Sequence, residues 1–159
     1  LDTCGFVPAN HFDGVLPLTD YVLYDLKLFD SGLHRKFCGV DNRLILDNAK
    51  MICSGISDGK YSCEFWIRTP LIPGATASEE NLSELAHFVV DKLGVQNVSR
   101  WELCASNNSC LGKYKRLEKK WDFEGVRLLN KAQVNALKTA VEQAGFPGEK
   151  LFATGIIAE

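Results

Sequence analysis

Hydrophobic and polar positions change their spacing along this chain, from that of strands to that of helices and back. Alternate side chains share a face in a strand, whereas side chains three or four apart share a face in a helix. Strands are predicted at 20–28, 61–69 and 97–104, and helices at 31–37, 43–53, 78–93 and 131–144. The order strand, helix, strand is typical of α/β proteins with parallel sheets and right-handed crossovers.

The predicted helices carry boundary signals. Asp30 or Ser31 is a suitable N-cap for the first helix, and Asp41 or Asn42 for the second. Ser78, followed by two glutamates, begins the third helix. These signals predict one continuous domain over residues 1–159, with no internal repeat.

The stretch 20–28 places charges inside an otherwise apolar strand. Tyr21, Leu23, Asp25 and Lys27 share one face of such a strand, and the other face is apolar. Parallel α/β enzymes have their sites at the carboxyl ends of strands, where Asp25 and Lys27 fall. The pair is therefore either part of a site or an ion pair that only satisfies itself.

Composition excludes several classes of protein. With 46% apolar residues, a chain of this length can bury a core as one domain. A formal net charge of −2 argues against a dedicated nucleic-acid binder. No apolar run approaches the roughly 20 residues that a membrane span needs, and no signal peptide is recognisable. We therefore expect a cytoplasmic protein with no nucleic-acid or membrane partner.

The cysteines predict neither disulfides nor a metal site. The six cysteines are widely and unevenly spaced, which argues against a disulfide framework. Cys38, Cys53 and Cys63 fall in apolar patterns and are predicted to be small core residues with free thiols. The run C-x-x-x-C-x-x-C, which would ligate an iron–sulfur cluster, does not occur.

Segments in a particular order carry a family resemblance. They are Leu1-Asp2-Thr3-Cys4-Gly5-Phe6, Tyr24-Asp25-Leu26-Lys27, Phe37-Cys38-Gly39-Val40-Asp41-Asn42 and the stretch 65–74, Phe-Trp-Ile-Arg-Thr-Pro-Leu-Ile-Pro-Gly. In this order and spacing the chain resembles the glycyl-radical enzyme activating enzymes, of the pyruvate formate-lyase activating type. The resemblance covers most of the chain and is strongest over residues 1–74.

The resemblance implies an α/β fold that is the C-terminal part of a partial parallel (β/α) barrel of the radical S-adenosylmethionine type. The chain starts in mid-element at Leu1, so the earlier strands are expected upstream and the barrel is expected to be incomplete. The full-length enzyme would use S-adenosylmethionine and an iron–sulfur cluster. A 5′-deoxyadenosyl radical would then abstract hydrogen from a glycine of a formate-lyase type partner enzyme. Without cluster ligands, this fragment is expected to bind neither cofactor and to be inactive.

The resemblance also assigns site residues. Asp25, Lys27, Arg68 and Asn107 match positions that contact S-adenosylmethionine, although Arg68 could instead pair with Glu64 or Asp25. Asn107 stands where the pyruvate formate-lyase activator has a histidine, so it can form hydrogen bonds but cannot titrate. It could equally be a loop former.

A cation site is implied at the start of the chain. Asp2 and Thr3 match an acid–threonine pair that ends an earlier strand of the family. With Asp25, they are expected to form an oxygen-rich site for a monovalent cation.

A second reading is a half-barrel that binds or assembles without catalysing. The segment 113–120 has five basic residues in eight, and is either a solvated surface or a docking patch for a protein partner. A truncated barrel would expose a sheet edge, at 21–29 or near Leu1, and an apolar inner face, so we expect self-association. A small hydrolase has little support, because no nucleophile–base pair is recognisable.

Overall fold

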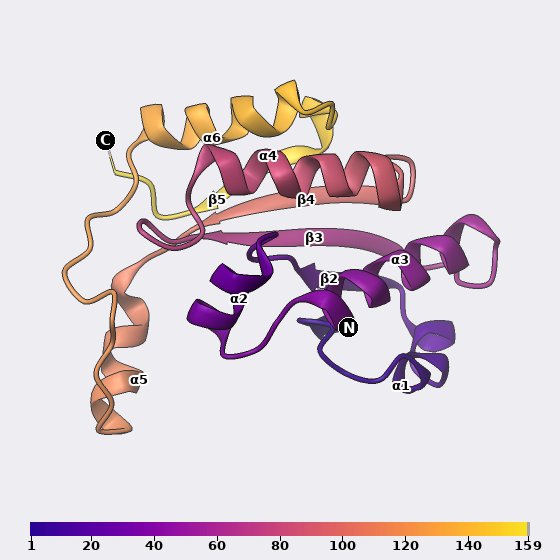
Figure 1. The fold of residues 1–159 in the computed structure, drawn as a ribbon, viewed down its shortest axis with the longest axis horizontal. Coiled ribbons are helices and arrows are strands. Elements are labelled where there is room, and N and C mark those ends of the chain that lie inside the picture. The colour runs from indigo at the N-terminus through magenta and orange to yellow at the C-terminus, as the bar shows by residue number, and fades with distance from the viewer. Residues whose placement is uncertain (159) are drawn as a thin grey trace.

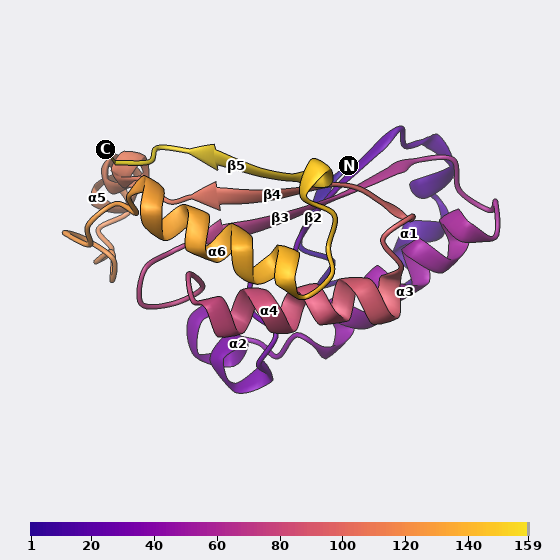
Figure 2. The same cartoon turned by 90° about the horizontal axis from the view of Figure 1, so that it is seen from above.

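The computed structural model describes residues 1–158 as a five-stranded sheet with helices on one of its faces (Figure 1, Figure 2). Neighbouring strands are parallel and follow chain order. They are β1 (Asp2–Thr3), β2 (Tyr21–Asp25), β3 (Glu64–Leu71), β4 (Val98–Ala105) and β5 (Leu151–Gly155). The predicted α/β class with a parallel sheet is confirmed.

The helices that follow β2, β3 and β4 return the chain to the start of the next strand. They are α2 (Ser31–Cys38), α3 (Arg43–Ser57), α4 (Glu79–Phe88), which continues as a π-helical turn to Leu93, and α6 (Lys131–Gln143). Short helices are α1 (Asn10–Asp13), α5 (Leu111–Arg116) and the 3₁₀ turns Leu16–Leu18, Asn108–Cys110 and Gly148–Lys150. Figure 1 shows α5 beyond the carboxyl ends of the strands, away from the other helices.

Predicted helix caps are largely confirmed. Asp30 Oδ1 accepts the Leu33 N–H at 2.6 Å, and Ser78 Oγ accepts the Asn81 N–H at 3.2 Å. Asn42 precedes α3 as predicted, but its side chain makes no capping hydrogen bond. Its amide bonds to another loop instead.

The core lies between the sheet and the helices on its covered face. Alternate strand residues point into it, among them Tyr24, Phe65 and Trp101, each 0% exposed. The Tyr24 and Phe65 rings pack with centroids 5.3 Å apart, and Trp101 meets Phe146 edge-on at 5.1 Å. No helix among residues 1–158 is long and apolar enough to cross a membrane.

The other face of the sheet is open, and it is not the apolar surface that was predicted. Glu64, Arg68, Arg100 and Glu102 lie on it between partly exposed aromatic side chains. The alternation that buries one set of side chains leaves the other set on this face. An apolar face was expected because a half-barrel would expose side chains that form the core of a closed barrel. That expectation overlooked the polar side chains on this face.

The sheet edges are β1 and β5. β1 covers part of β2, pairing Asp2 with Leu23 and Thr3 with Tyr24, so the edge falls near Leu1 and not along 21–29. The short β1 leaves few backbone groups for another strand to pair with.

One cysteine prediction is wrong. Cys53 and Cys63 are buried at 1% and 4% exposure, as predicted. Cys38, the last residue of α2, is exposed. All six thiols are free.

Two buried acids should make the protein sensitive to alkali. Burial raises the pKa of the Cys53 thiol to about 12 and the pKa of Tyr24 still further. In the unfolded chain these groups ionise near pH 8.5 and 10. From about pH 9 upward the unfolded state therefore loses protons that the folded state keeps, and stability falls by up to about 1.4 kcal/mol per pH unit for each group.

We expect urea midpoints to fall steadily between about pH 9 and 11, and the fall to be shallower in Cys53→Ala. A Cys63→Ala variant controls for loss of a neighbouring buried thiol, since the pKa of Cys63 is raised without so large a shift. Equal slopes in all these proteins would contradict the assignment to Cys53.

Candidate functional site

Charged side chains gather at the carboxyl end of the sheet, on its open face. Asp25 is the last residue of β2 and pairs in register with Arg68 of β3. Lys27 follows β2 by two residues and so returns to the face of Asp25. Parallel strands align their carboxyl ends, which brings these residues to one edge.

Contacts join them into what we call the strand-end cluster, made of Asp2, Asp25, Lys27 and Arg68. The Arg68 Nη2 donates to Asp25 Oδ1 at 3.1 Å and also to the Asp2 carboxylate. The Lys27 Nζ donates to Asp25 Oδ2 at 3.1 Å. The two carboxylates and the two cations of the cluster balance in charge. A charged ligand that binds here must therefore replace some of these ion pairs and cannot simply add its own.

Arg68 is the centre of the strand-end cluster. Burial alone would lower its pKa, but hydrogen bonds and charge from Asp2 and Asp25 outweigh that effect and raise the pKa. Its Nε is buried and has no hydrogen-bond partner within residues 1–158. A buried guanidinium donor without a partner is rare, and a carboxylate or hydroxyl would satisfy it if the Arg68 side chain shifted to expose it.

Arg68 pairs with Asp25 and Asp2, and not with Glu64. The Glu64 carboxylate accepts the Trp66 Nε1–H at 3.1 Å instead. Arg100 lies over the Trp66 ring at 4.9 Å and over Phe152 at 4.1 Å. Its Nε donates to Glu102 at 2.8 Å, so this part of the open face has its own ion pair.

Buried hydrogen bonds link the core to the cluster. Thr69 is 0% exposed and its Oγ1 donates to the Leu26 carbonyl at 2.7 Å. The indole Nε1–H of Trp101 donates to the same Thr69 oxygen at 3.0 Å. This chain from β4 through β3 fixes the backbone beside Asp25.

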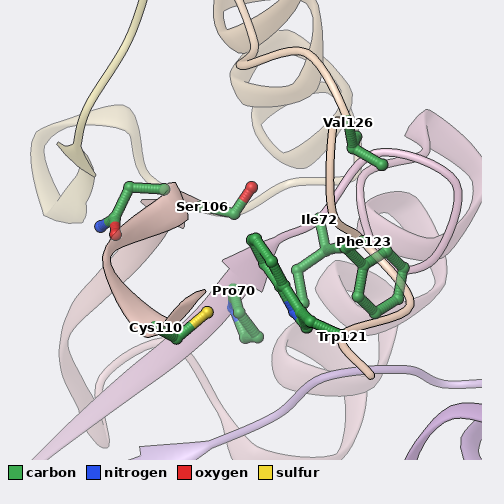
Figure 3. A pocket seen from close by; sticks show the side chains of 8 residues that line it. Pro70, Ile72, Ser106, Cys110, Trp121, Phe123 and Val126 are labelled. Atoms are coloured by element: carbon green, nitrogen blue, oxygen red, sulfur yellow. The ribbon is translucent and has the colours of Figure 1, made fainter. Parts of the chain in front are cut away.

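A pocket of about 210 Å³ lies at the same edge, beyond β3 and β4 (Figure 3). Figure 3 shows the Trp121 ring standing between Pro70 and Phe123. Trp121 and Phe123 come from the segment after α5, and their rings lie 6.1 Å from Tyr114 and 6.3 Å from Phe37. The lining is completed by Ile72, Ser106, Asn107, Cys110 and Val126.

Asn107 lines this pocket but does not join the cluster. Its Oδ1 accepts the Ser109 N–H at 2.8 Å, as in a loop-forming asparagine. Within the described chain it makes no hydrogen bond with Asp25, Lys27 or Arg68. The predicted cofactor residues thus form a contacting trio and one neighbour in the adjoining pocket.

The predicted cation ligands only partly converge. The Asp2 and Asp25 carboxylates share Arg68, whose guanidinium lies between them. Thr3 Oγ1 accepts the Gly5 N–H at 3.0 Å. Among residues 1–158, no three His, Cys, Asp or Glu side chains are grouped so as to hold a metal ion.

Sequence reasoning missed the aromatic wall of the pocket. Trp121 and Phe123 are in a strongly polar stretch, where large aromatic side chains have no helical or strand pattern to explain them. Aromatic residues isolated in a polar stretch were the sequence signal that could have indicated this pocket wall. The basic side chains between 113 and 120 are all exposed, so a solvated surface accounts for them and a docking role stays a prediction.

Comparisons with known proteins find activating enzymes among the relatives of this chain. It is 30% identical over 146 residues to the trans-4-hydroxy-L-proline dehydratase activating enzyme of Clostridioides difficile, covering 92% of this chain and 46% of that protein. It is 30% identical over 149 residues to the pyruvate formate-lyase 1-activating enzyme of Escherichia coli K12, covering 91% and 56%. The chain therefore spans about half the length of the curated relatives it matches. No family model matches it.

A solved structure has the same fold. A domain of a pyruvate-formate lyase-activating enzyme from Bacteroides vulgatus superposes with a TM-score of 0.68, covering 99% of this chain and 79% of that one. At 21% identity this likeness supports the fold alone. The parallel sheet described above is consistent with part of a barrel.

Proposed function

Because the homologues of this chain are glycyl-radical enzyme activating enzymes, we propose that it is the cofactor-positioning part of such an enzyme. The whole enzyme would generate a glycyl radical on a partner enzyme, of which the formate-lyase type is the default. The observation that carries the proposal is the strand-end cluster, with its unpartnered Arg68 Nε.

The donors of the cluster suit S-adenosylmethionine. Its carboxylate and ribose hydroxyls are acceptors that match the Arg68 guanidinium and the Lys27 ammonium. Asp25 holds both cations in place, at 3.1 Å each. Asn107, in the adjoining pocket, is proposed to contact the adenosyl group. When bound and reductively cleaved, the cofactor supplies the radical that abstracts hydrogen.

An iron–sulfur cluster does not fit the described residues. The free cysteines include two buried ones, and no group of three ligating side chains is present within residues 1–158. We therefore assign no step of the reaction to a cluster on this chain. In the full-length enzyme its ligands would be supplied elsewhere.

Two further assignments remain proposals. Asp2, Thr3 and Asp25 are proposed to admit a monovalent cation, for which Arg68 would have to release one carboxylate. The cytoplasm is proposed as the location, in keeping with thiols that are all free.

A hybrid enzyme tests the proposed function. Residues 1–159 would replace the aligned stretch of the Clostridioides difficile relative, the rest of which is kept. The anaerobic hybrid, with a reductant and S-adenosylmethionine, is expected to form 5′-deoxyadenosine. A control hybrid with scrambled residues at 20–28 should form none. A folded hybrid that is as inactive as the scrambled one would contradict the proposal.

The isolated chain is expected to be inactive. Without ligands for a cluster it has no electron donor, and only side chains such as Arg68 and Lys27 remain to hold the amino acid end of the cofactor. Iron content and 5′-deoxyadenosine would be measured after anaerobic treatment with iron and sulfide. Stoichiometric iron with cofactor cleavage above a protein-free blank would refute this expectation.

Self-association of the isolated chain is expected through the open face and not through a long edge. Tyr21 and Phe152 are exposed there at 46% and 38%. Light scattering over a wide concentration range should show a dimer or larger species, weakened in Phe152→Ser. A strictly monomeric chain would instead favour the self-contained binding module.

A further inference from the structure

Beyond Leu26, the segment that carries Lys27 is held by side chains and not by sheet pairing. β2 ends at Asp25, and the backbone runs on through residues 26–29 before α2 begins. Leu26 and Leu28 are buried at 1% and 2% exposure, so this backbone lies at the core. Lys27, between them, is directed to the open face and to Asp25.

Buried backbone groups need hydrogen-bond partners, and leaving one without a partner costs about 1–3 kcal/mol. Past the end of a strand, the sheet can no longer supply them. Thr69 already accounts for the Leu26 carbonyl. The carbonyls of residues 27–29 and the Phe29 N–H are instead bonded by side chains.

Asn81, in the first turn of α4, binds both ends of this segment. Its Nδ2 donates to the Lys27 carbonyl at 3.0 Å and to the Thr76 carbonyl at 3.0 Å. Its Oδ1 accepts the Phe29 N–H at 2.9 Å. The side chain is 4% exposed, and both amide hydrogens and the oxygen are used.

Asn42, just before α3, binds the same segment. Its Nδ2 donates to the Leu28 carbonyl at 2.9 Å and to the Phe29 carbonyl at 2.6 Å. It is 3% exposed and does not cap its own helix. Asn42, at the end of the segment 37–42, therefore bonds a neighbouring loop and does not act as a side-chain cap.

We propose that Asn42 and Asn81 are positioning residues that hold the backbone of residues 27–29 so that the Lys27 ammonium stays against Asp25. We call Asn42 and Asn81 together the clamp. Its relevance to the cofactor rests on the proposed function, whereas its effect on the position of Lys27 does not. A lysine on a flexible stem keeps one position only where its backbone is fixed. Two side-chain amides, one just before α3 and one in α4, supply that fixation.

The test measures the acetylation rate of Lys27 relative to Lys50, by mass spectrometry with a soluble acetylating reagent and no cofactor. Lys50 belongs to a separate surface pair with Asp47. In Asn42→Ala and Asn81→Ala the relative rate should rise about two- to fivefold, as the Lys27–Asp25 pair loosens. Circular dichroism would verify that each variant is folded.

Asn48 provides the matched control. It is also a buried asparagine, at 2% exposure, and its Nδ2 also donates to two carbonyls, those of Gly5 and Val7 at 2.8 Å each. Asn48→Ala should leave the Lys27 rate unchanged. An unchanged rate in folded Asn42→Ala and Asn81→Ala, or an equal rise in Asn48→Ala, would overturn the proposal.

Amide hydrogen exchange in the unaltered protein keeps the proposal testable if the variants do not fold. The Phe29 amide, bound only by Asn81, should exchange as slowly as the Leu26 amide, which donates to the Arg68 carbonyl at 3.0 Å. Exchange of Phe29 at the rate of a free amide would also overturn the clamp. Neither measurement involves the cofactor, so failure of the proposed function would leave both results intact.

Discussion

Truncation of Trp101 to alanine is expected to lower the free energy of unfolding by about 3–5 kcal/mol. The ring is 0% exposed and packs edge-on against Phe146 at 5.1 Å. Its Nε1–H donates to Thr69, which in turn donates to the Leu26 carbonyl. The loss would therefore leave a cavity and an unpaired hydroxyl acceptor at once. Since domains of this kind are stable by about 5–15 kcal/mol, a large part of the stability would go.

Urea unfolding of Trp101→Ala checks this expectation, with Trp66→Ala as the control. Trp66 is a tryptophan of the neighbouring strand but lies on the open face, against Tyr21 and Arg100. Its truncation should cost about 1 kcal/mol. Similar losses for the two variants would mean that the covered face of the sheet is not the core.

Replacement of Arg68 by alanine in the hybrid enzyme is expected to lower 5′-deoxyadenosine formation about 30-fold or more at limiting cofactor. Arg68 joins Asp2 to Asp25 and holds the unpartnered Nε. Its removal takes away a cationic contact for the cofactor and leaves two carboxylates unpaired near a carboxylate ligand. Both effects weaken binding, so the Michaelis constant for the cofactor should rise.

Arg35→Ala is the matched control for this change. Arg35 also pairs with an aspartate, Asp41 at 3.1 Å, but its side chain is 65% exposed, on α2. Its loss should change the rate less than about twofold. If Arg68→Ala were no more harmful than Arg35→Ala, the ion pairs at the strand ends would be structural only.

The part of the site that was predictable from the sequence is the part in which strand periodicity determines the face on which each side chain lies. Alternation along 20–28 placed Asp25 and Lys27 on one face, and they form an ion pair there. The choice between Glu64 and Asp25 as partner of Arg68 could not be made from spacing alone. It depends on the register of β2 against β3, which aligns Asp25 with Arg68.

Elements that depend on tertiary contacts were not predictable. β5 is only Leu-Phe-Ala-Thr-Gly, and its identity as a strand comes from pairing with β4. The sequence 111–116, Leu-Gly-Lys-Tyr-Lys-Arg, offers no apolar stripe to indicate α5. Propensity and period are weak guides for segments this short.

For the same reason, hydrogen bonds between side chains and distant loops could not be predicted from the sequence. Asn42 satisfies the rule for a helix cap, yet its amide binds carbonyls of residues 28 and 29. Cys38 lies in an apolar pattern too short to fix which side of α2 faces the core. The Asn42 outcome depends on which buried groups a neighbouring segment leaves without partners.

Equilibrium binding of S-adenosylmethionine to the anaerobic hybrid enzyme shows whether the strand-end cluster holds the cofactor, because binding requires no turnover. We expect saturable binding that Lys27→Ala weakens by at least about tenfold, whereas Lys50→Ala leaves it unchanged. Equal affinities for the unaltered hybrid and folded Lys27→Ala would contradict the claim that this edge of the sheet holds the cofactor.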